Sequence, residues 1–296
     1  MLIDERNLWA LAHYPFISLK QKWQLLKLDP TLHFLNTKIQ STSTSLQKTI
    51  EQFIQFSNTF PYDELKERYF IQKIEVVSLQ NSLYPLSLLQ VYLPPLLLFT
   101  KGNTSLLNKE KIAVIGSRKG NEEGKRIIEQ LFPSLIDRGM VIVSGGAKGI
   151  DFYAHDSTLK LGGNTIAVLA GGLFHMYPRN HLSLFREIAL DSLVVTEHPP
   201  STFVQKWHFV ERNRIISGIS KGVIVIQAEI NSGSMSTVRH ALDQGKEVFV
   251  TPGCWGHALS KGPQLLAKEG ATLVTCSDDI FREIENKPFT NIASFV

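Results

Sequence analysis

The apolar residues of this chain follow two different spacings. Over the first 70 residues they recur at intervals of three and four, as in Leu46, Ile50, Phe53 and Ile54, which is the spacing of one helix face. From about residue 112 they form short continuous runs separated by amphipathic stretches. We therefore expect a small all-helical domain over 1–70 and a larger domain of alternating strands and helices over 71–296.

The continuous runs predict seven strands in the larger domain. Strands that are apolar throughout and separated by helices are typical of a parallel sheet covered by helices on both faces, so an α/β fold is expected. The stretch from 71 to 102 is expected to be a transition marked by turns at Tyr84-Pro85 and Pro94-Pro95. The predicted strands are Ala113–Ile115, Val141–Val143, Thr165–Leu169, Leu193–Thr196, Val223–Ile226, Glu247–Val250 and Ala271–Val274.

Composition and charge narrow the class of protein. The net charge of +4 over 296 residues permits a nucleic-acid partner without demanding one. Two cysteines, Cys254 and Cys276, argue against a disulfide framework and against a metal site or a thiol nucleophile. The acidic N-terminus is unlike a signal peptide, and the most apolar stretch, 92–99, is too short to span a membrane. A cytoplasmic protein without membrane contact is expected.

Glycine-rich loops with cations follow several of the predicted strands. Gly116-Ser117-Arg118 comes after the first strand, and a second loop containing Gly145, Gly146 and Lys148 comes after the next. Glycines at strand ends expose backbone N–H groups, so these loops predict a phosphate-binding edge of the sheet. Arg118 stands where a dinucleotide fingerprint requires its second glycine, and no Walker loop occurs. Because Glu122 and Glu123 open the following helix, we place the phosphate at Arg118 rather than at that helix end.

Two further clusters combine cations with aromatic or amide groups. Tyr177, Arg179 and Asn180 lie on a proline turn, where a ring and a cation could hold a base and a phosphate. Arg212 and Arg214 flank Asn213, and their spacing indicates that one organises the site while the other faces the ligand.

Asp151 and His155 lie four residues apart on one predicted helix. They could form an acid–base pair. We favour a structural role instead, in which Asp151 caps the glycine loop and His155 is its buried partner, because neither a nucleophile nor a metal set accompanies them.

Seven separated motifs resemble the DNA-processing protein A family and cover about residues 75 to 275. The resemblance implies an extended Rossmann-like domain preceded by a sterile-alpha-motif-like helical domain. It also implies a homodimer that binds single-stranded DNA and loads the RecA recombinase during natural transformation. The motifs are GSR at 116–118, SGGAKGID with AH at 144–155, GGNTIAVLAGG at 162–172, YPRN at 177–180, RNRIISGIS at 212–220, SGSMST at 232–237 and PG at 252–253.

The resemblance also assigns the binding site. Arg118 and Arg179 correspond to basic residues of the family's DNA pocket, and Arg212 and Arg214 correspond to its R-N-R motif. No catalytic residue, cofactor or metal is expected. The residues expected to contact DNA are Gly116, Ser117, Arg118, Gly145, Gly146, Lys148, Tyr177, Arg179, Asn180, Arg212, Asn213, Arg214, Ser232, Gly233 and Ser234.

The chain departs from the family pattern in three places. Gln227-Ala228 stands where Glu-Ala is usual, and Pro263-Gln264-Leu265-Leu266 replaces a Cys-Asn or related stretch in the region of the family's dimer contacts. The chain ends at Val296, so no C-terminal winged helix is expected.

Two other functions remain open from the residues. A nucleotide-monophosphate enzyme of the phosphoribohydrolase-like fold would need a catalytic Glu after the SGS loop, where Val238-Arg239 follows instead. A protein-interaction scaffold is the third possibility.

Overall fold

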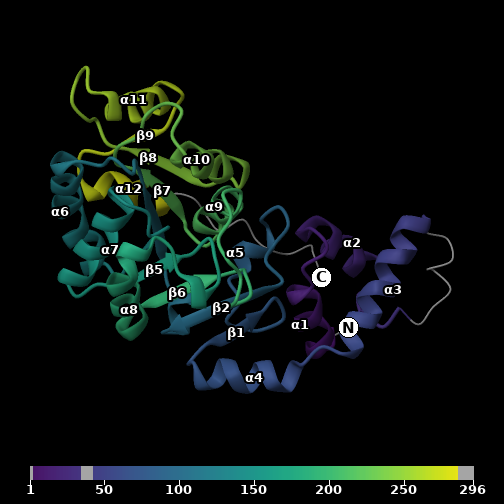
Figure 1. The fold of residues 1–296 in the computed structure, drawn as a ribbon. Helices are drawn as coiled ribbons and strands as arrows, with labels where there is room; N and C mark the ends of the chain where they lie inside the picture. Colours follow the sequence, from purple (N-terminus) through teal and green to yellow (C-terminus); the bar gives the residue numbers. More distant parts are fainter. Residues whose placement is uncertain (1–2, 35–42, 286–296) are drawn as a thin grey trace.

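A nine-stranded sheet forms the centre of the protein in the computed structural model, which describes residues 3–34 and 43–285 (Figure 1). The strand order is β1-β2-β6-β5-β4-β3-β7-β8-β9. The strands are β1 Glu75–Ser78, β2 Leu97–Gly102, β3 Lys111–Ile115, β4 Val141–Ser144, β5 Thr165–Val168, β6 Leu193–Thr196, β7 Gly222–Val225, β8 Glu247–Val250 and β9 Thr272–Leu273.

The seven predicted strands are confirmed as β3 to β9, and all of them pair in parallel. The sheet also contains β1 and β2, which the sequence analysis placed in a transition without strands. Strand β2 pairs antiparallel with both β1 and β6. The prolines at 94 and 95 lie just before β2, and β1 has only four residues of mixed burial, so neither run gave a clear strand signal.

Helices cover both faces of the sheet, as the apolar runs predicted. One face packs against α5 (Leu86–Leu89), α9 (His208–Gly218), α10 (Ser234–Asp243) and α11 (Lys261–Lys268). The other packs against α6 (Glu122–Asp137), α7 (Ile150–Lys160), α8 (Leu182–Asp191) and α12 (Ser277–Glu285). The expected α/β class with a mostly parallel sheet is therefore confirmed.

Within the described residues, four α-helices precede the sheet: α1 (Glu5–His13), α2 (Leu19–Leu28), α3 (Thr44–Asn58) and α4 (Tyr62–Ile71). Figure 1 shows them gathered beside the β1–β2 edge of the sheet. Their buried side chains, such as Leu8 and Phe53, belong to one apolar cluster with Phe99 of β2 and Phe185 of α8. The helical N-terminal region is confirmed, and its core continues into the sheet, so the division into domains at residue 70 and the sterile-alpha-motif likeness stay predictions.

The path of the chain reverses beside β3. From β3 the chain builds β4, β5 and β6 to one side, then returns to β7 on the other side of β3 and adds β8 and β9. The carboxyl ends of β3 and β7 therefore flank a topological switch point, where ligands bind in open α/β sheets. Within the described residues, none of the helices is both long and apolar enough to cross a membrane.

Candidate nucleic-acid interface

A cavity of about 340 Å³ opens at this switch point. The loop after β3, the loop after β7 and the first turns of α9 form its walls. Eight of the fifteen predicted site residues line it, so segments more than 100 positions apart in the sequence meet here. They are Gly116, Ser117, Arg118, Arg212, Asn213, Ser232, Gly233 and Ser234.

The loop after β3 is fixed by its backbone. Ser117 N–H donates to the carbonyl of Gln227 at 2.6 Å, and the Ser117 carbonyl accepts from Ile150 N–H at 3.2 Å. A Cβ at position 116 would lie 2.5 Å from the Ile150 side chain, so only glycine fits there. The loop thereby holds Ser117 buried and leaves the side chain of Arg118 exposed.

The Arg118 guanidinium lies over an aromatic ring. Its Cζ atom is 5.3 Å from the centroid of Phe209, at the start of α9, and the edge of Tyr177 meets the same ring at 5.9 Å. A cation on the face of a ring is attracted to the electron density of that face. The cavity therefore presents an oriented positive charge beside aromatic surface.

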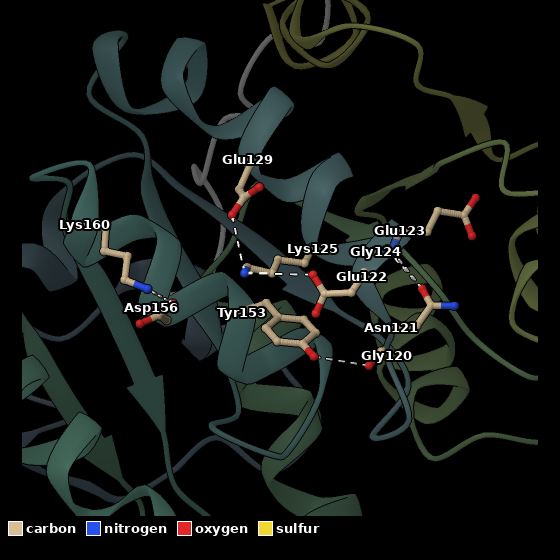
Figure 2. A network of polar contacts seen from close by, with 10 residues as sticks. All are labelled: Gly120, Asn121, Glu122, Glu123, Gly124, Lys125, Glu129, Tyr153, Asp156 and Lys160. Carbon is tan, nitrogen blue, oxygen red and sulfur yellow. Dashed lines mark hydrogen bonds and ion pairs between the residues drawn. The ribbon is translucent and has the colours of Figure 1, made fainter.

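Gln227, which stands where Glu is usual in the family, holds the end of the loop after β3 through Asn121. Gln227 Nε2 donates to Asn121 Oδ1 at 2.7 Å, and Asn121 N–H donates back to Gln227 Oε1 at 3.1 Å. Asn121 Oδ1 also accepts from Glu123 N–H and Gly124 N–H and so caps helix α6 (Figure 2). A carboxylate at 227 could accept but could not donate to Asn121.

The N-terminus of α6 is closed to an anion, as the sequence analysis expected. Asn121 occupies its amide groups, and Glu122 and Glu123 add negative charge in the first turn. Figure 2 shows Lys125 between the carboxylates of Glu122 and Glu129, at 4.0 and 3.9 Å, so this neighbouring cation is already paired. Arg118 and Lys119 line the cavity, and Lys119 is paired with Glu229 at 3.4 Å, whereas Lys125 is not part of the lining.

Replacing Asn121 with Ala should lower the free energy of unfolding by about 1 kcal/mol, because two amides lose their cap. Asn121→Ser should retain most of the stability, since a hydroxyl still caps the helix. Urea unfolding of both variants against the parent chain measures the difference. An unchanged midpoint for Asn121→Ala would contradict the role given to this cap.

Arg212 is buried and binds backbone carbonyls. Its Nη1 donates to Gly145 O at 2.7 Å and to Val168 O, and its Nε donates to Asn213 Oδ1 at 3.2 Å. Burial lowers the pKa of Arg212 to about 10, so the group keeps its charge at neutral pH. Arg212 therefore organises the ends of β4 and β5, as one of the two arginines was expected to do.

Asp151 has the structural role favoured from the sequence. Its Oδ2 accepts from Gly145 N–H at 3.2 Å and from Ala147 N–H at 3.3 Å, so it caps the glycine loop. Burial raises the pKa of this carboxyl, and the charge of Arg212 and the two amide donors oppose that rise. The expected pairing with His155 is wrong, because the Nδ1 atom of His155 shares a hydrogen bond of 2.7 Å with Thr165 Oγ1.

Arg214 does not reach the cavity. Its buried guanidinium forms an ion pair with Glu197, just after β6. The expectation that one of the two arginines points freely at a ligand is therefore not met, since Arg212 lines the cavity while bonded to carbonyls and Arg214 faces Glu197.

The six remaining predicted residues do not line the cavity. Tyr177, Arg179, Asn180 and Lys148 are exposed, whereas Gly145 and Gly146 are buried. His181 joins the turn containing Tyr177 to the glycine loop, because its Nδ1 atom shares a hydrogen bond of 3.0 Å with the carbonyl of Gly146. The turn containing Tyr177 is thus fixed near the glycine loop and beside Phe209.

Phe209 is the functional candidate that the sequence analysis missed. An aromatic residue before a polar cluster at a helix start is usually a core residue, so the sequence pattern around Phe209 did not indicate a role in binding. Its position opposite the Gly116–Arg118 loop follows only from the sheet order. The described residues contain no group of three or more His, Cys, Asp or Glu side chains placed to hold a metal ion.

His155 makes stability depend on pH. The side chain is fully buried, and burial lowers its pKa from 6.5 to about 3. Below pH 6.5 the unfolded chain binds a proton that the folded chain excludes, so stability is full above pH 6.5 and falls as pH decreases toward 3. From pH 7 to 5 we expect His155 alone to cost about 2 kcal/mol.

Urea unfolding at both pH values, with His155→Gln as the comparison, measures this effect. The variant should show the smaller loss on acidification because its side chain does not titrate. Equal losses for the variant and the parent chain would contradict the assignment.

The family model and the relatives with similar sequences indicate the same family. The family described as DNA recombination-mediator protein A matches residues 75–285. DNA processing protein DprA of Bacillus subtilis is 39% identical over 280 residues, covering 91% of each chain. DNA processing protein DprA of Streptococcus pneumoniae is 42% identical over 229 residues, covering 74% of this chain and 81% of the relative.

Two solved structures extend the likeness to the fold. The X-ray structure of DprA from S. pneumoniae has a TM-score of 0.81 at 35% identity, covering 96% of this chain and 99% of that one. A structure of DNA processing protein A from Helicobacter pylori, solved to examine its single-stranded DNA binding mode, has a TM-score of 0.64 at 31% identity and covers 71% and 96%.

Proposed function

Because the chain belongs to the DNA recombination-mediator protein A family, we propose that it binds single-stranded DNA at the carboxyl edge of its sheet and promotes loading of RecA onto that DNA. The observation that supports binding most directly is the Arg118 guanidinium over Phe209, with Tyr177 against the same ring. Proteins that hold single strands without sequence preference combine cations for phosphates with rings for bases.

We propose that binding proceeds without catalysis. Asp151 lines the cavity but already caps two backbone amides, and His155 is fully buried against Thr165, so the two do not form an acid–base pair there. The SGS loop after β7 leads into Val238-Arg239, without the Glu that a nucleotide-cleaving enzyme would need there. The second candidate, an enzyme acting on nucleotide monophosphates, predicts release of free base from a nucleotide panel.

Competition distinguishes a polynucleotide site from a mononucleotide site. A fluorescent oligothymidylate of about 20 nucleotides is bound to the full chain, and either unlabelled oligonucleotide or thymidine monophosphate is added at equal phosphate concentration. Only the oligonucleotide should displace the label, since several contacts act together on one strand. Displacement by the mononucleotide at similar phosphate concentration would favour the enzyme.

RecA loading and dimerisation extend the same proposal. The sheet edge beyond β8 exposes Leu242 of α10 and Leu273 of β9, with 59% and 48% of their surfaces accessible, which offers apolar area to a second copy. Light scattering of the purified chain tests the dimer. The rate of RecA filament growth on DNA coated with single-strand-binding protein, with and without this chain, tests the loading.

A further inference from the structure

Two pairs of aromatic side chains lie at the carboxyl edge of the sheet, one at the Arg118 cavity and one outside its lining. Phe209 lies under Arg118, and Tyr177 meets Phe209 edge-on. Two residues before Tyr177, the ring of His175 stacks on Phe203 with centroids 3.8 Å apart and planes 20° apart. The cavity lining includes Phe209 but not the His175–Phe203 pair, so this pair is a separate feature.

Two adjacent loops hold the pair in place. The loop after β5 carries His175, and the loop after β6 carries Phe203. Gly172 N–H donates to Thr202 O, and Phe174 N–H donates to Pro200 O, both at 2.9 Å. These bonds join the loops beside both rings, so the pair is fixed at the carboxyl edge of β5 and β6 before any ligand arrives.

The outer ring of the pair is open to water. Phe203, the outer ring, is 65% exposed although it stacks on His175. Tyr177, the outer ring at the Arg118 cavity, is 49% exposed although it contacts Phe209. Exposed cations lie on the same two loops, Arg179 beside Tyr177 and Lys206 beyond Phe203. Rings alternating with cations fit a single strand, whose bases offer π-faces and whose backbone carries a charge at every nucleotide.

We propose that the DNA strand bound at Arg118 continues past Tyr177 onto the His175–Phe203 pair, where a base stacks on the open face of Phe203. The proposal rests on the proposed single-strand binding and adds a direction to it: the strand crosses the ends of β5 and β6. The opposite direction would lead over the loop after β8, which carries Trp255, a ring that is 98% exposed.

Oligonucleotide length separates the two sites. Anisotropy titrations of the full chain use labelled oligothymidylates of about 4 and about 20 nucleotides. Phe203→Ala should weaken binding of the longer strand about 5- to 150-fold, the range expected for loss of one base–ring stack, and should leave binding of the shorter strand unchanged. Phe203→Trp should restore the affinity, and Trp255→Ala, which removes an even more exposed ring on the other side, should have no effect.

The outcomes separate failure of this site from failure of the function. Unchanged binding of the longer strand to Phe203→Ala, or a loss on Trp255→Ala instead, would overturn the proposed direction while leaving DNA binding intact. An equal loss of affinity for both oligonucleotide lengths would place Phe203 inside the Arg118 site and would also overturn the proposed direction. If the parent chain binds neither strand, the proposed function itself fails.

Discussion

Arg212→Met should lower the free energy of unfolding by about 3–5 kcal/mol, the usual cost of leaving a buried charge without compensation. The variant leaves the carbonyls of Gly145 and Val168 without their donor, and it leaves the buried carboxylate of Asp151 without its neighbouring cation. Urea unfolding at pH 7.5 measures the loss. Arg239→Met, which alters an exposed arginine of α10, should change stability by less than about 0.5 kcal/mol.

A second variant tests the reason for this loss. If the cost comes from the stranded charge of Asp151, adding Asp151→Asn to Arg212→Met should recover part of the stability, because the asparagine is neutral and its side-chain oxygen still accepts from the loop amides. Additive losses would show that Arg212 acts only through the carbonyls. A loss below about 1 kcal/mol for Arg212→Met alone would contradict its role in organising the site.

Arg118→Ala combined with Arg179→Ala should weaken single-stranded DNA binding about 100-fold or more. Each hydrogen bond to a charged group contributes about 1.5–3 kcal/mol, and both side chains are exposed, so the fold should not change. Anisotropy titration measures the loss, and circular dichroism checks the fold. The slope of log affinity against log salt should also fall by about 0.7 for each phosphate contact removed.

Lys125→Ala provides the charge-matched control for each single variant, Arg118→Ala or Arg179→Ala. Lys125 lies one helical turn into α6 and is already paired with Glu122 and Glu129, so its removal should change affinity little. Equal losses for Lys125→Ala and for either single variant would indicate a response to net charge alone. Unchanged affinity in the double variant would exclude Arg118 and Arg179 as phosphate contacts.

The strands and loops that leave a local pattern in the sequence could be predicted from it. Apolar runs located β3 to β8 because these parallel strands are largely buried on both faces, and a shorter run located the partly exposed strand β9. Glycines at strand ends located the loops that form the cavity. Strand β2 was missed because it follows two prolines and pairs antiparallel with both of its neighbours, β1 and β6. Its partner β6 begins 96 residues later, where no local pattern could indicate the pairing.

The site was less predictable than the sheet, because its geometry depends on contacts between distant residues. Arg212 and Arg214 are equivalent in the sequence, and only Glu197 and the carbonyl of Gly145 distinguish their roles. Gln227 was seen as a departure from the family, but its bond to Asn121 spans 106 residues. Phe209 became a candidate binding residue only in the structure, where its ring lies under the Arg118 guanidinium.

The central claim is that the carboxyl edge of this sheet binds a single strand through its phosphates and bases. A salt titration with single-stranded and duplex oligonucleotides of equal length, measured by anisotropy on the full chain, tests it most directly. We expect tighter binding of the single strand at every salt concentration, with log affinity falling linearly against log salt with a slope of about 0.7 per phosphate contacted. Equal or tighter binding of the duplex, or affinity independent of salt, would contradict it.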